Sequence, residues 1–543
     1  MTKKPGLLTG AVVGLFLTAP LVAIFYAGWK LAGLPFVPFQ VFDWTARVLP
    51  GRVITFGIDT MVKVIRALNI ADTSTAAKAA EQSMAIAVFL VIGVLAGALL
   101  FAFLRLLRSR LSVFPGLVAG ALLGAGSVAL ARSLGRVEAV PRSIGEAWTI
   151  AAWLGWGMAL GLANRRLSRR RIALPGEAAR DAWDDRVERV DRRRFIVKLG
   201  AATATITVAG AVVGKFVGKS LRPAEVATGK RWSVDHPLPN AGAAVKPAPG
   251  TRPEYTPLED HYRIDITTIP PVVDGARWRL KVGGLVERPL ELPLDRIRAY
   301  EPLHQFVTLA CISNPVAGTL IGTTRWTGVS FQRLLPDLRL KSNATHLKIT
   351  SADRFYEVVA LETIRSDPRV MLAYEWDGVP LTTPHGFPLR IYIPDHYGMK
   401  QPKWILEIEA IDHWEPGYWV KRGWDQTAQM KATSVIDTVS VDMMLSEADR
   451  NTRIPVGGIA HAGARGISKV EVRTDDGPWH EAQLRTPLSG TTWVVWRYDW
   501  PFQKGQHRLT VRCFDGSGAL QNAELAPPHP SGASGYHEKA VML

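Results

Sequence analysis

Cysteine is nearly absent from this sequence, which has only Cys311 and Cys513 among its 543 residues. The two lie about 200 positions apart, so the sequence argues against a disulfide framework or a Cys-rich zinc site. It also contains neither a C-x-x-C-H haem attachment motif nor the cysteine set of an iron–sulfur cluster. A lone cysteine acts as a nucleophile, serves as a single metal ligand, or packs as a small hydrophobic residue.

Histidine is missing from the first 235 residues, since the first one is His236. This region therefore cannot hold a haem between two histidines. No G-x-G-x-x-G follows a predicted strand and no phosphate-binding loop motif occurs, which argues against nicotinamide, flavin and nucleoside triphosphates. We expect no haem, no flavin and no nicotinamide in this protein.

Positive charge exceeds negative charge, with a formal net charge of +17 at pH 7. Much of the excess lies in two runs, at 165–171 and 186–198. A basic run can indicate nucleic-acid binding, but arginines next to apolar segments of about 20 residues more often set membrane topology. We therefore expect a lipid bilayer as partner and no nucleic acid.

Four apolar segments approach the length that a bilayer requires, and they predict a four-helix transmembrane region over residues 1–171. The basic residues that flank them predict a cytoplasmic N-terminus and a multi-pass protein of a bacterial cell membrane. Between residues 34 and 80 we expect an interfacial or re-entrant helix on the outer side. The four segments are 6–29, 84–104, 111–131 and 147–163.

Residues 172–220 begin as a polar, cytoplasmic segment and continue into a fifth apolar helix. The junction resembles a twin-arginine export signal, with Arg192 and Arg193, then Phe195, Ile196 and Lys198, before an Ala/Gly/Thr-rich stretch. An ordinary helix with basic flanking residues is the alternative. The export reading implies the twin-arginine export machinery as a partner, because that machinery moves folded proteins.

The sequence of the C-terminal half predicts soluble domains that follow a linker. Residues 221–257 are rich in Pro, Ala and Gly and predict an extended linker. Residues 258–435 alternate strand patterns with short helices, which predicts a mixed α+β domain. Residues 436–543 show short alternating strands separated by turns, which predicts an all-β sandwich, with Cys513 in its core.

Cys311 closes an apolar strand pattern and precedes a Ser-Asn-Pro turn, so its thiol is predicted at a strand-to-loop junction. Together with T-R-W-T-G-V and L-L-P downstream, this segment resembles the molybdenum-binding segment of the sulfite oxidase family. In that family one cysteine thiolate ligates a molybdenum that is held by a single molybdopterin. The resemblance, which starts at about Tyr262, implies that Cys311 is the metal ligand and a catalytic residue.

The run H-G-F-P-L-R-I-Y-I-P-D-H-Y-G-M-K-Q-P-K-W at 385–404 resembles the family's cofactor-binding signature. A dianionic phosphate needs guanidinium, ammonium and free N–H donors, and this run supplies them. Two earlier stretches, H-Y-R and I-T-S, fall where the family contacts the pterin. The resemblance implies cofactor contacts at Tyr262, Arg263, Thr350, Ser351, His385, Arg390, Lys400, Gln401, Pro402 and Lys403.

The sequence departs from the family around the expected substrate site. Sulfite-oxidising members carry an arginine pair shortly after the cysteine, where this chain has Pro315 and Val316. A tyrosine near the metal aligns with Trp424, which we interpret with Arg263 as catalytic. Because an oxyanion needs cationic donors to offset desolvation, these changes argue against sulfite. We expect two-electron redox or oxygen-atom transfer on another small molecule, such as an S-oxide or N-oxide, with the direction left open.

The resemblance also implies an immunoglobulin-like C-terminal domain that forms a homodimer contact. Because the chain has no second redox centre of its own, we expect a separate electron-transfer partner, either a redox protein or a quinone-linked one. The catalytic domains are expected on the extracytoplasmic side. Two alternatives are a non-catalytic cell-surface scaffold on a degenerate cofactor domain, and a small transporter with an outer receptor.

Overall fold

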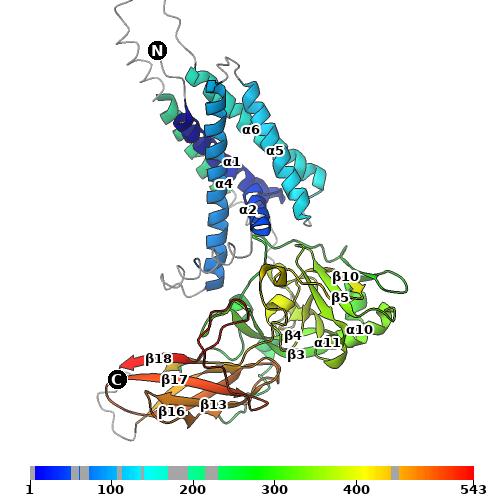
Figure 1. Cartoon of the computed structure of the whole chain (residues 1–543), viewed down its shortest axis with the longest axis vertical. Helices are drawn as coiled ribbons and strands as arrows, with labels where there is room; N and C mark the ends of the chain where they lie inside the picture. The colour runs from blue at the N-terminus through cyan, green and yellow to red at the C-terminus, as the bar shows by residue number, and fades with distance from the viewer. Residues whose placement is uncertain are drawn as a thin grey trace, which may run out of the picture. The chain divides into compact units, whose positions relative to one another are not determined.

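A computed structural model describes residues 6–49, 60, 73–106, 113–135, 140–168, 194–213, 230–441 and 452–542. The chain divides into two compact units (Figure 1). The helical unit comprises Met1–Leu49, Ala77–Val226 and Ile266–Val272, and the β-rich unit comprises Pro50–Ala76, Ala227–Asp265 and Val273–Leu543. Arg192 and Arg193 of the predicted export signal lie outside the described residues.

The helical unit is built from long helices. Four helices of the described part are long and apolar enough to cross a membrane: α1, part of α4, α5 and the helix Arg194–Val213. The predicted segment 147–163 lies within α6, which is long but is not among these four, because polar residues such as Arg142, Glu146 and Asn164 interrupt it. The bounds are α1 Leu7–Ala32, α2 Val37–Val48, α4 Thr73–Leu106, α5 Phe114–Leu134 and α6 Arg142–Ser168.

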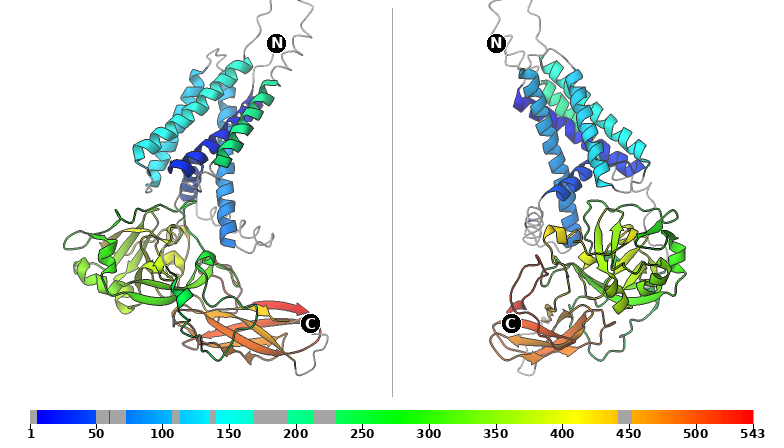
Figure 2. Two further views of the ribbon diagram at one scale, coloured as in Figure 1. Left: turned by 180° about the vertical axis from the view of Figure 1, so that it is seen from behind. Right: turned by 45° about the vertical axis from the view of Figure 1, so that its right-hand side comes forward.

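Figure 2 shows the long helices of this unit from two further sides. Glycines let several of these helices approach each other closely. A methyl group built on Gly97 of α4 would lie closer than 3.0 Å to the backbone of α1, and one built on Gly157 would lie as close to the α5 backbone. Small residues at helix contacts are the usual means of close packing inside membranes, where apolar side chains gain nothing by leaving the lipid. The contacts α1–α4 and α5–α6 therefore depend on the absence of side chains.

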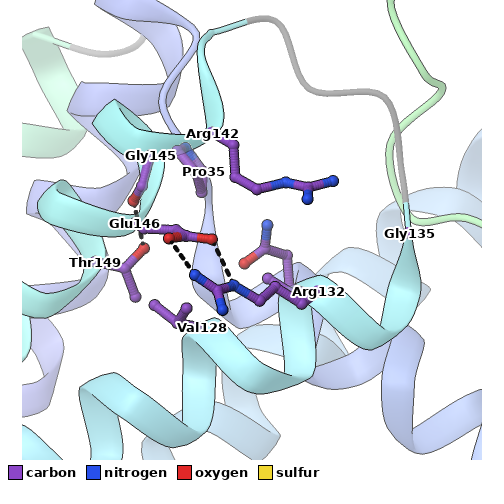
Figure 3. Close-up of a pocket in the computed structure, with 10 residues that line it drawn as sticks. Pro35, Val128, Arg132, Gly135, Arg142, Gly145, Glu146 and Thr149 are labelled. Carbon is purple, nitrogen blue, oxygen red and sulfur yellow. Dashed lines mark hydrogen bonds and ion pairs between the residues drawn. The ribbon is translucent and has the colours of Figure 1, made fainter.

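Some polar side chains of this unit are paired with one another. Trp156 Nε1 donates to Thr18 Oγ1 at 3.1 Å, and the Arg132 guanidinium donates twice to the Glu146 carboxylate at 2.7 Å. Figure 3 shows this ion pair between α5 and α6, in a pocket that Pro35 and Arg142 also line. The bond between the buried Trp156 and Thr18 offsets the cost of removing these two polar groups from water, whereas the Arg132–Glu146 pair is exposed.

The short segment Ile266–Val272 belongs to the helical unit, although the residues on both sides of it belong to the β-rich unit. Thr268 donates from its backbone N and its hydroxyl to Asp43 of α2, at 3.0 and 2.6 Å. Lys78 of α4 donates to the carbonyl of Thr267 at 2.7 Å. Asp43 is 1% exposed, so α2 contributes a buried carboxylate that fastens this segment.

The β-rich unit begins with two sheets. The first has the order β2-β1-β10-β5-β6, and the second runs β3-β4-β7-β8 with β9 on β7. All pairs are antiparallel except β1 with β10. The strands are β1 Arg279–Gly284, β2 Leu290–Pro293, β3 Leu303–Ala310, β4 Ile321–Ser330, β5 His346–Ser351, β6 Tyr356–Ala360, β7 Met371–Trp376, β8 Val379–Pro380, β9 Arg390–Tyr392 and β10 Ile405–Ile411.

Short helices connect these strands, as the α+β pattern predicts. An apolar core joins α10 to the first sheet through fully buried side chains such as Phe331, Leu334, Leu347 and Ile408. Burying such side chains contributes roughly 1.5 to 3 kcal/mol each. The helices and helical turns are α8 Trp232–Asp235, η1 Leu258–Asp260, α9 Leu294–Arg298, α10 Phe331–Leu338, α11 Leu361–Ser366, η2 Thr383–His385, η3 Gly398–Lys400 and η4 Val420–Arg422.

Two four-stranded antiparallel sheets form the C-terminal domain, in the orders β11-β12-β16-β15 and β14-β13-β17-β18. Side chains of both sheets share one core, which includes Trp496 and Cys513. The expected boundary at residue 436 falls inside β11, so the domain begins slightly earlier. The strands are β11 Thr433–Val439, β12 Arg453–His461, β13 Ile467–Thr474, β14 His480–Glu481, β15 Gln483–Leu484, β16 Val494–Pro501, β17 Gln506–Asp515 and β18 His537–Met542.

Residues 230–257, expected as part of an extended linker, have little regular structure but are fastened along the β-rich unit. Glu254 pairs with Arg485 at 2.9 Å, with both side chains 8% exposed. Arg252 pairs with Asp437 at 2.6 Å. This part of the chain is therefore not a free tether, since buried ion pairs hold it to the C-terminal domain.

Two glycines of α6 provide a matched test of helix packing. We expect Gly157→Ala to lower the melting temperature of the full chain in detergent, because its methyl group meets the α5 backbone. Gly155→Ala meets nothing within 4 Å and should leave stability unchanged or raise it by up to about 1 kcal/mol through helix propensity. Equal melting temperatures for the two variants would contradict close α5–α6 packing.

Candidate cofactor and metal site

Cys311 follows β3 directly, as the sequence predicts. Its backbone N donates to the Leu320 carbonyl at 2.9 Å, and Asn314 Oδ1 accepts from the Leu320 N at 2.9 Å. These bonds close the loop between β3 and β4. The Sγ atom lies 2.9 Å from the Ser313 hydroxyl, and the residue is 8% exposed.

Burial sets the state of this thiol. It raises the pKa of Cys311, while the Ser313 hydroxyl and backbone and the positive charge of Lys403 act in the opposite direction. A neutral thiol is a poor metal ligand, so coordination requires that the thiol release its proton to water when a cation binds. Among the described residues, no group of three or more His, Cys, Asp or Glu side chains is arranged to hold a metal ion. A metal here would depend on Cys311 and a cofactor.

Arg390 and Lys403 are the two central cations of the site. Arg390 starts β9, is 4% exposed, donates to the His385 carbonyl at 3.1 Å and lies over the Trp326 ring at 4.5 Å. Lys403 donates to the carbonyls of Ile264 and Pro384 at 3.1 and 3.2 Å. Burial lowers the pKa of Arg390 to about 10 and that of Lys403 to about 8.

A left-handed turn at Gly386 brings the two cations together. Gly386 has φ +113°, and a methyl group on it would meet the Cβ atoms of Arg390 and Lys403 at 3.2 and 3.3 Å. Only glycine adopts this conformation without strain and leaves this space open. The glycine of the H-G-F motif therefore has a direct packing role.

An aromatic and histidine cluster surrounds the cations. The His261 ring stacks on Tyr262, with centroids 5.4 Å apart, and the His385 ring lies 4.4 Å from Trp376. Burial, together with the nearby charges of Arg390 and Lys403, lowers the pKa of His261 to about 4 and that of His385 well below its ordinary value. Both imidazoles are therefore neutral at physiological pH.

Several buried polar atoms of this cluster have no hydrogen-bond partner within the described part of the chain. Buried polar groups are nearly always satisfied, so a group of such atoms indicates a ligand or bound water. Together with the excess of positive charge, they fit an anionic cofactor with many polar groups. The atoms are His261 Nε2, Ser351 Oγ, Arg390 Nε and Gln401 Oε1.

Backbone hydrogen bonds link the segments that carry the other predicted cofactor residues. Ser351 ends β5 and is 1% exposed, and Thr350 precedes it in the strand. The next residue, Ala352, donates to the Trp404 carbonyl at 2.9 Å. The Pro402 carbonyl accepts from the backbone N of Ile391 at 3.1 Å. The three stretches that the sequence singled out therefore meet in space.

Two predicted cations have protein partners that the sequence did not indicate. The Lys400 ammonium donates to Glu357 at 3.0 Å, and these side chains are 8% and 0% exposed. Arg263 donates to Asp265 at 2.7 Å, and its charge acts on Lys403 and His385. Lys400 therefore supports the turn η3 through a buried ion pair, and Arg263 lies on the Lys403 side of the cluster.

Trp424 lies on the Cys311 side. It is 9% exposed and belongs to one apolar cluster with Ala310, Ile312 and Tyr397. Its ring meets the His529 ring edge to face at 5.0 Å. Its position next to the loop is compatible with the role predicted for it, which stays a prediction.

Sequence reasoning missed His261, Trp326, Trp376 and Glu357. His261 lies in the H-Y-R motif and Trp326 in the T-R-W-T-G-V motif. Their positions next to Tyr262 and Arg325 could therefore have indicated them. Trp376 and Glu357 had no local signal, because their partners His385 and Lys400 come from other strands and turns.

Comparison with known proteins assigns two family models to the β-rich unit. The oxidoreductase molybdopterin binding domain matches residues 266–419, and the Mo-co oxidoreductase dimerisation domain matches residues 425–526. Both matches fall where the sequence predicted a cofactor domain followed by a second domain. Cys311, His385, Arg390 and Lys403 lie inside the first match, whereas His261, Tyr262 and Arg263 precede it.

Curated relatives cover the same half. The chain is 24% identical over 312 residues to sulfite oxidase of Gallus gallus, across 47% of this chain and 66% of the relative. It is 25% identical over 284 residues to sulfite oxidase of Arabidopsis thaliana, across 44% and 72%. The chain spans little more than half the length of several other sulfite oxidases, such as that of Rattus norvegicus, at 55%.

Two further matches are to proteins that are not named as sulfite oxidases. A putative protein-methionine-sulfoxide reductase subunit YedZ1 of Azospira oryzae is 29% identical over 153 residues, across 28% of this chain and 56% of that protein. The crystal structure of the sulfane dehydrogenase SoxCD from Paracoccus pantotrophus matches with a TM-score of 0.44 and 20% identity, across 51% of this chain and 78% of that chain.

The depressed pKa of His261 predicts a pH dependence of stability. Its folded pKa is about 4 and its ordinary value 6.5, so the unfolded state binds more protons between these pH values. The free energy of unfolding should therefore fall as pH drops from 6.5 to 4, by on the order of 3 kcal/mol from this group. His261→Phe should remove that part of the slope in denaturant titrations of the full chain.

The exposed His236 gives the control, since His236→Phe should keep the slope of the wild type. If His261→Phe and the wild type lose stability equally on acidification, the buried neutral imidazole is not the cause.

Proposed function

Because residues 266–526 belong to the sulfite oxidase family of molybdopterin-dependent oxidoreductases, we propose that this chain is a membrane-anchored enzyme of that type. It would perform two-electron redox or oxygen-atom transfer on a small substrate outside the cytoplasm. The observation that carries this proposal is the buried thiol of Cys311 next to a cluster of buried cations and unpartnered polar atoms.

Each residue of the site would have a separate role in binding the metal and the pterin. Cys311 would ligate molybdenum, while Arg390, Lys403 and Arg263 would hold the anionic groups of the pterin. Molybdenum, when bound, supplies two-electron chemistry with oxygen-atom transfer. Tyr262 and the neutral imidazoles His261 and His385 would donate or accept hydrogen bonds without adding charge. A scaffold with a degenerate site would have no ligand to satisfy these unpartnered buried donors and acceptors.

Membrane attachment, export and partners complete the proposal. The four apolar helices would anchor the chain in a bacterial membrane, and the segment around Arg192 would direct export through the twin-arginine machinery. The match to a Mo-co dimerisation domain supports a homodimer through the immunoglobulin-like C-terminal domain. Electrons would pass to or from a separate redox protein or a quinone-linked partner.

The two cysteines provide a matched test of the metal site. Cys311→Ser should abolish binding of molybdenum, from about one atom per chain to near zero, because a hydroxyl is a far weaker ligand for a soft redox metal. Elemental analysis of the purified full chain measures this. Cys513→Ser changes a thiol in the C-terminal core and should keep the metal. Retention of molybdenum in Cys311→Ser would refute the assignment of the ligand.

Export can be tested with two arginine pairs. Changing Arg192 and Arg193 to Lys should leave the β-rich unit inaccessible to external protease in spheroplasts, because the export signal requires the arginine pair. Changing Arg165 and Arg166 to Lys keeps the same charge and should not affect accessibility. Export of the first variant would refute the twin-arginine hypothesis.

A further inference from the structure

The helical unit contains a pocket that the proposed redox chemistry does not use (Figure 3). It lies where three segments meet, namely the start of α2, the end of α5 and the start of α6. Arg47 of α2 donates to the Leu134 carbonyl of α5 at 3.3 Å, which fastens the first two segments to each other. The lining residues that matter here are Gln40, Val128, Ala131, Arg132, Arg142, Glu146 and Thr149.

Aromatic side chains gather at the same end of the helical unit. Pro35 lines the pocket, and the next residue, Phe36, stacks on Trp29 of α1 with ring centroids 5.8 Å apart. Tyr26 and Phe39 meet the Phe36 ring edge to face at 6.1 and 4.5 Å. Tryptophan and tyrosine concentrate at the level of lipid headgroups, because their rings are apolar and their N–H and O–H groups are polar. In a membrane, this end of the unit therefore belongs at headgroup level.

The charged side chains of the pocket leave one positive charge without a carboxylate. Arg132 donates through two of its nitrogens to both oxygens of Glu146, at 2.7 Å each. Glu146 is the only carboxylate among the described residues that line the pocket. The Arg142 side chain forms no hydrogen bond or ion pair with any described residue. The pocket therefore offers an anion the Arg142 guanidinium and the remaining terminal nitrogen of Arg132.

The uncharged part of the lining changes from polar to apolar along α5. Gln40 brings an amide with two N–H donors, and the Thr149 hydroxyl donates to the Gly145 carbonyl at 2.9 Å. Val128 and Ala131 come before Arg132 in α5, and Val128 lies one turn, about 5.4 Å, deeper in the unit. A phosphate with an attached hydrocarbon chain matches both parts of the lining. A free phosphate would leave the apolar part in water.

We propose that this pocket binds the phosphate of an anionic phospholipid, with Arg142 as its main cation and Arg132 and Gln40 as further donors. This inference rests on the membrane attachment in the proposed function, and it adds a specific lipid to the partners of the chain. An ethanolamine headgroup would place an ammonium beside two guanidinium groups, while Glu146 is already paired. The charges therefore favour an anionic lipid such as phosphatidylglycerol over a zwitterionic one.

The experiment uses the full chain, purified in detergent and titrated with dioleoylphosphatidylglycerol. Native mass spectrometry measures the fraction of chains that retain lipid. We expect the Kd of the tightest-bound lipid to rise about tenfold in Arg142→Gln, as for one lost charge-assisted hydrogen bond. Arg142→Lys keeps the charge and should recover part of the affinity. Arg165→Gln removes an exposed arginine near the other end of α6, and this matched control should bind like the wild type.

Competition distinguishes the two sources of phosphate. Inorganic phosphate at equal concentration should not displace the lipid, because it makes no contact with Val128 and Ala131. Dioleoylphosphatidylethanolamine should bind more weakly than the phosphatidylglycerol. Displacement by inorganic phosphate would overturn the assignment to a lipid. Equal affinity of the wild type and Arg142→Gln, or tighter binding of the ethanolamine lipid, would overturn the site itself.

A separate measurement tests the membrane attachment on which this inference rests. Alkaline carbonate should leave the full chain in cell membranes, because apolar helices that cross a bilayer are not extracted without detergent. Extraction by carbonate would refute the attachment. A chain that resists extraction but shows no effect of Arg142→Gln would refute the lipid site alone, so the two failures are distinct.

Discussion

Positive charge held away from water is the constraint on which the β-rich unit depends. Arg390 is buried and the Lys403 side chain is 13% exposed, while Asp265 provides the nearest carboxylate, 3.5 Å from the Lys403 ammonium. The remaining compensation comes from backbone carbonyls at His385, Pro384 and Ile264. Carbonyl dipoles reduce the cost of burying a cation but do not cancel its charge. The site therefore keeps an excess of positive charge, which favours binding of an anion.

The elements around the site hold Arg390, Lys403 and the strand before Cys311 in place. The Arg390 guanidinium lies over the Trp326 ring and the Lys403 ammonium over the Trp404 ring. Gly386 has no side chain where the stems of these two cations meet. Thr491 and Ser489 of the C-terminal domain bind the carbonyl of Phe306 on β3, the strand that ends at Cys311. The C-terminal domain therefore fixes the position of the strand that precedes Cys311.

Local patterns predicted the features that local physics determines. The strand-to-loop position of Cys311 and the long apolar helices follow from hydrophobic periodicity and turn residues. The run around Arg390 was singled out by its resemblance to the family's cofactor-binding signature. The pairing of Lys400 with Glu357 and of Glu254 with Arg485 could not be read, because the partners are 43 and 231 positions apart. For the same reason residues 230–257 looked like a tether, since composition says nothing about the surface on which a segment lies.

The segment Ile266–Val272 has a mechanical consequence. Asp265 holds Arg263 and lies near Lys403, whereas Thr267 and Thr268 are tied to α4 and α2. Only Ile266 separates these two sets of bonds, and one residue spans at most about 3.6 Å of chain. Within two residues the chain therefore passes from the ion pairs of the β-rich unit to the polar bonds of the helical unit, which leaves no spare residue for an insertion or deletion at this point.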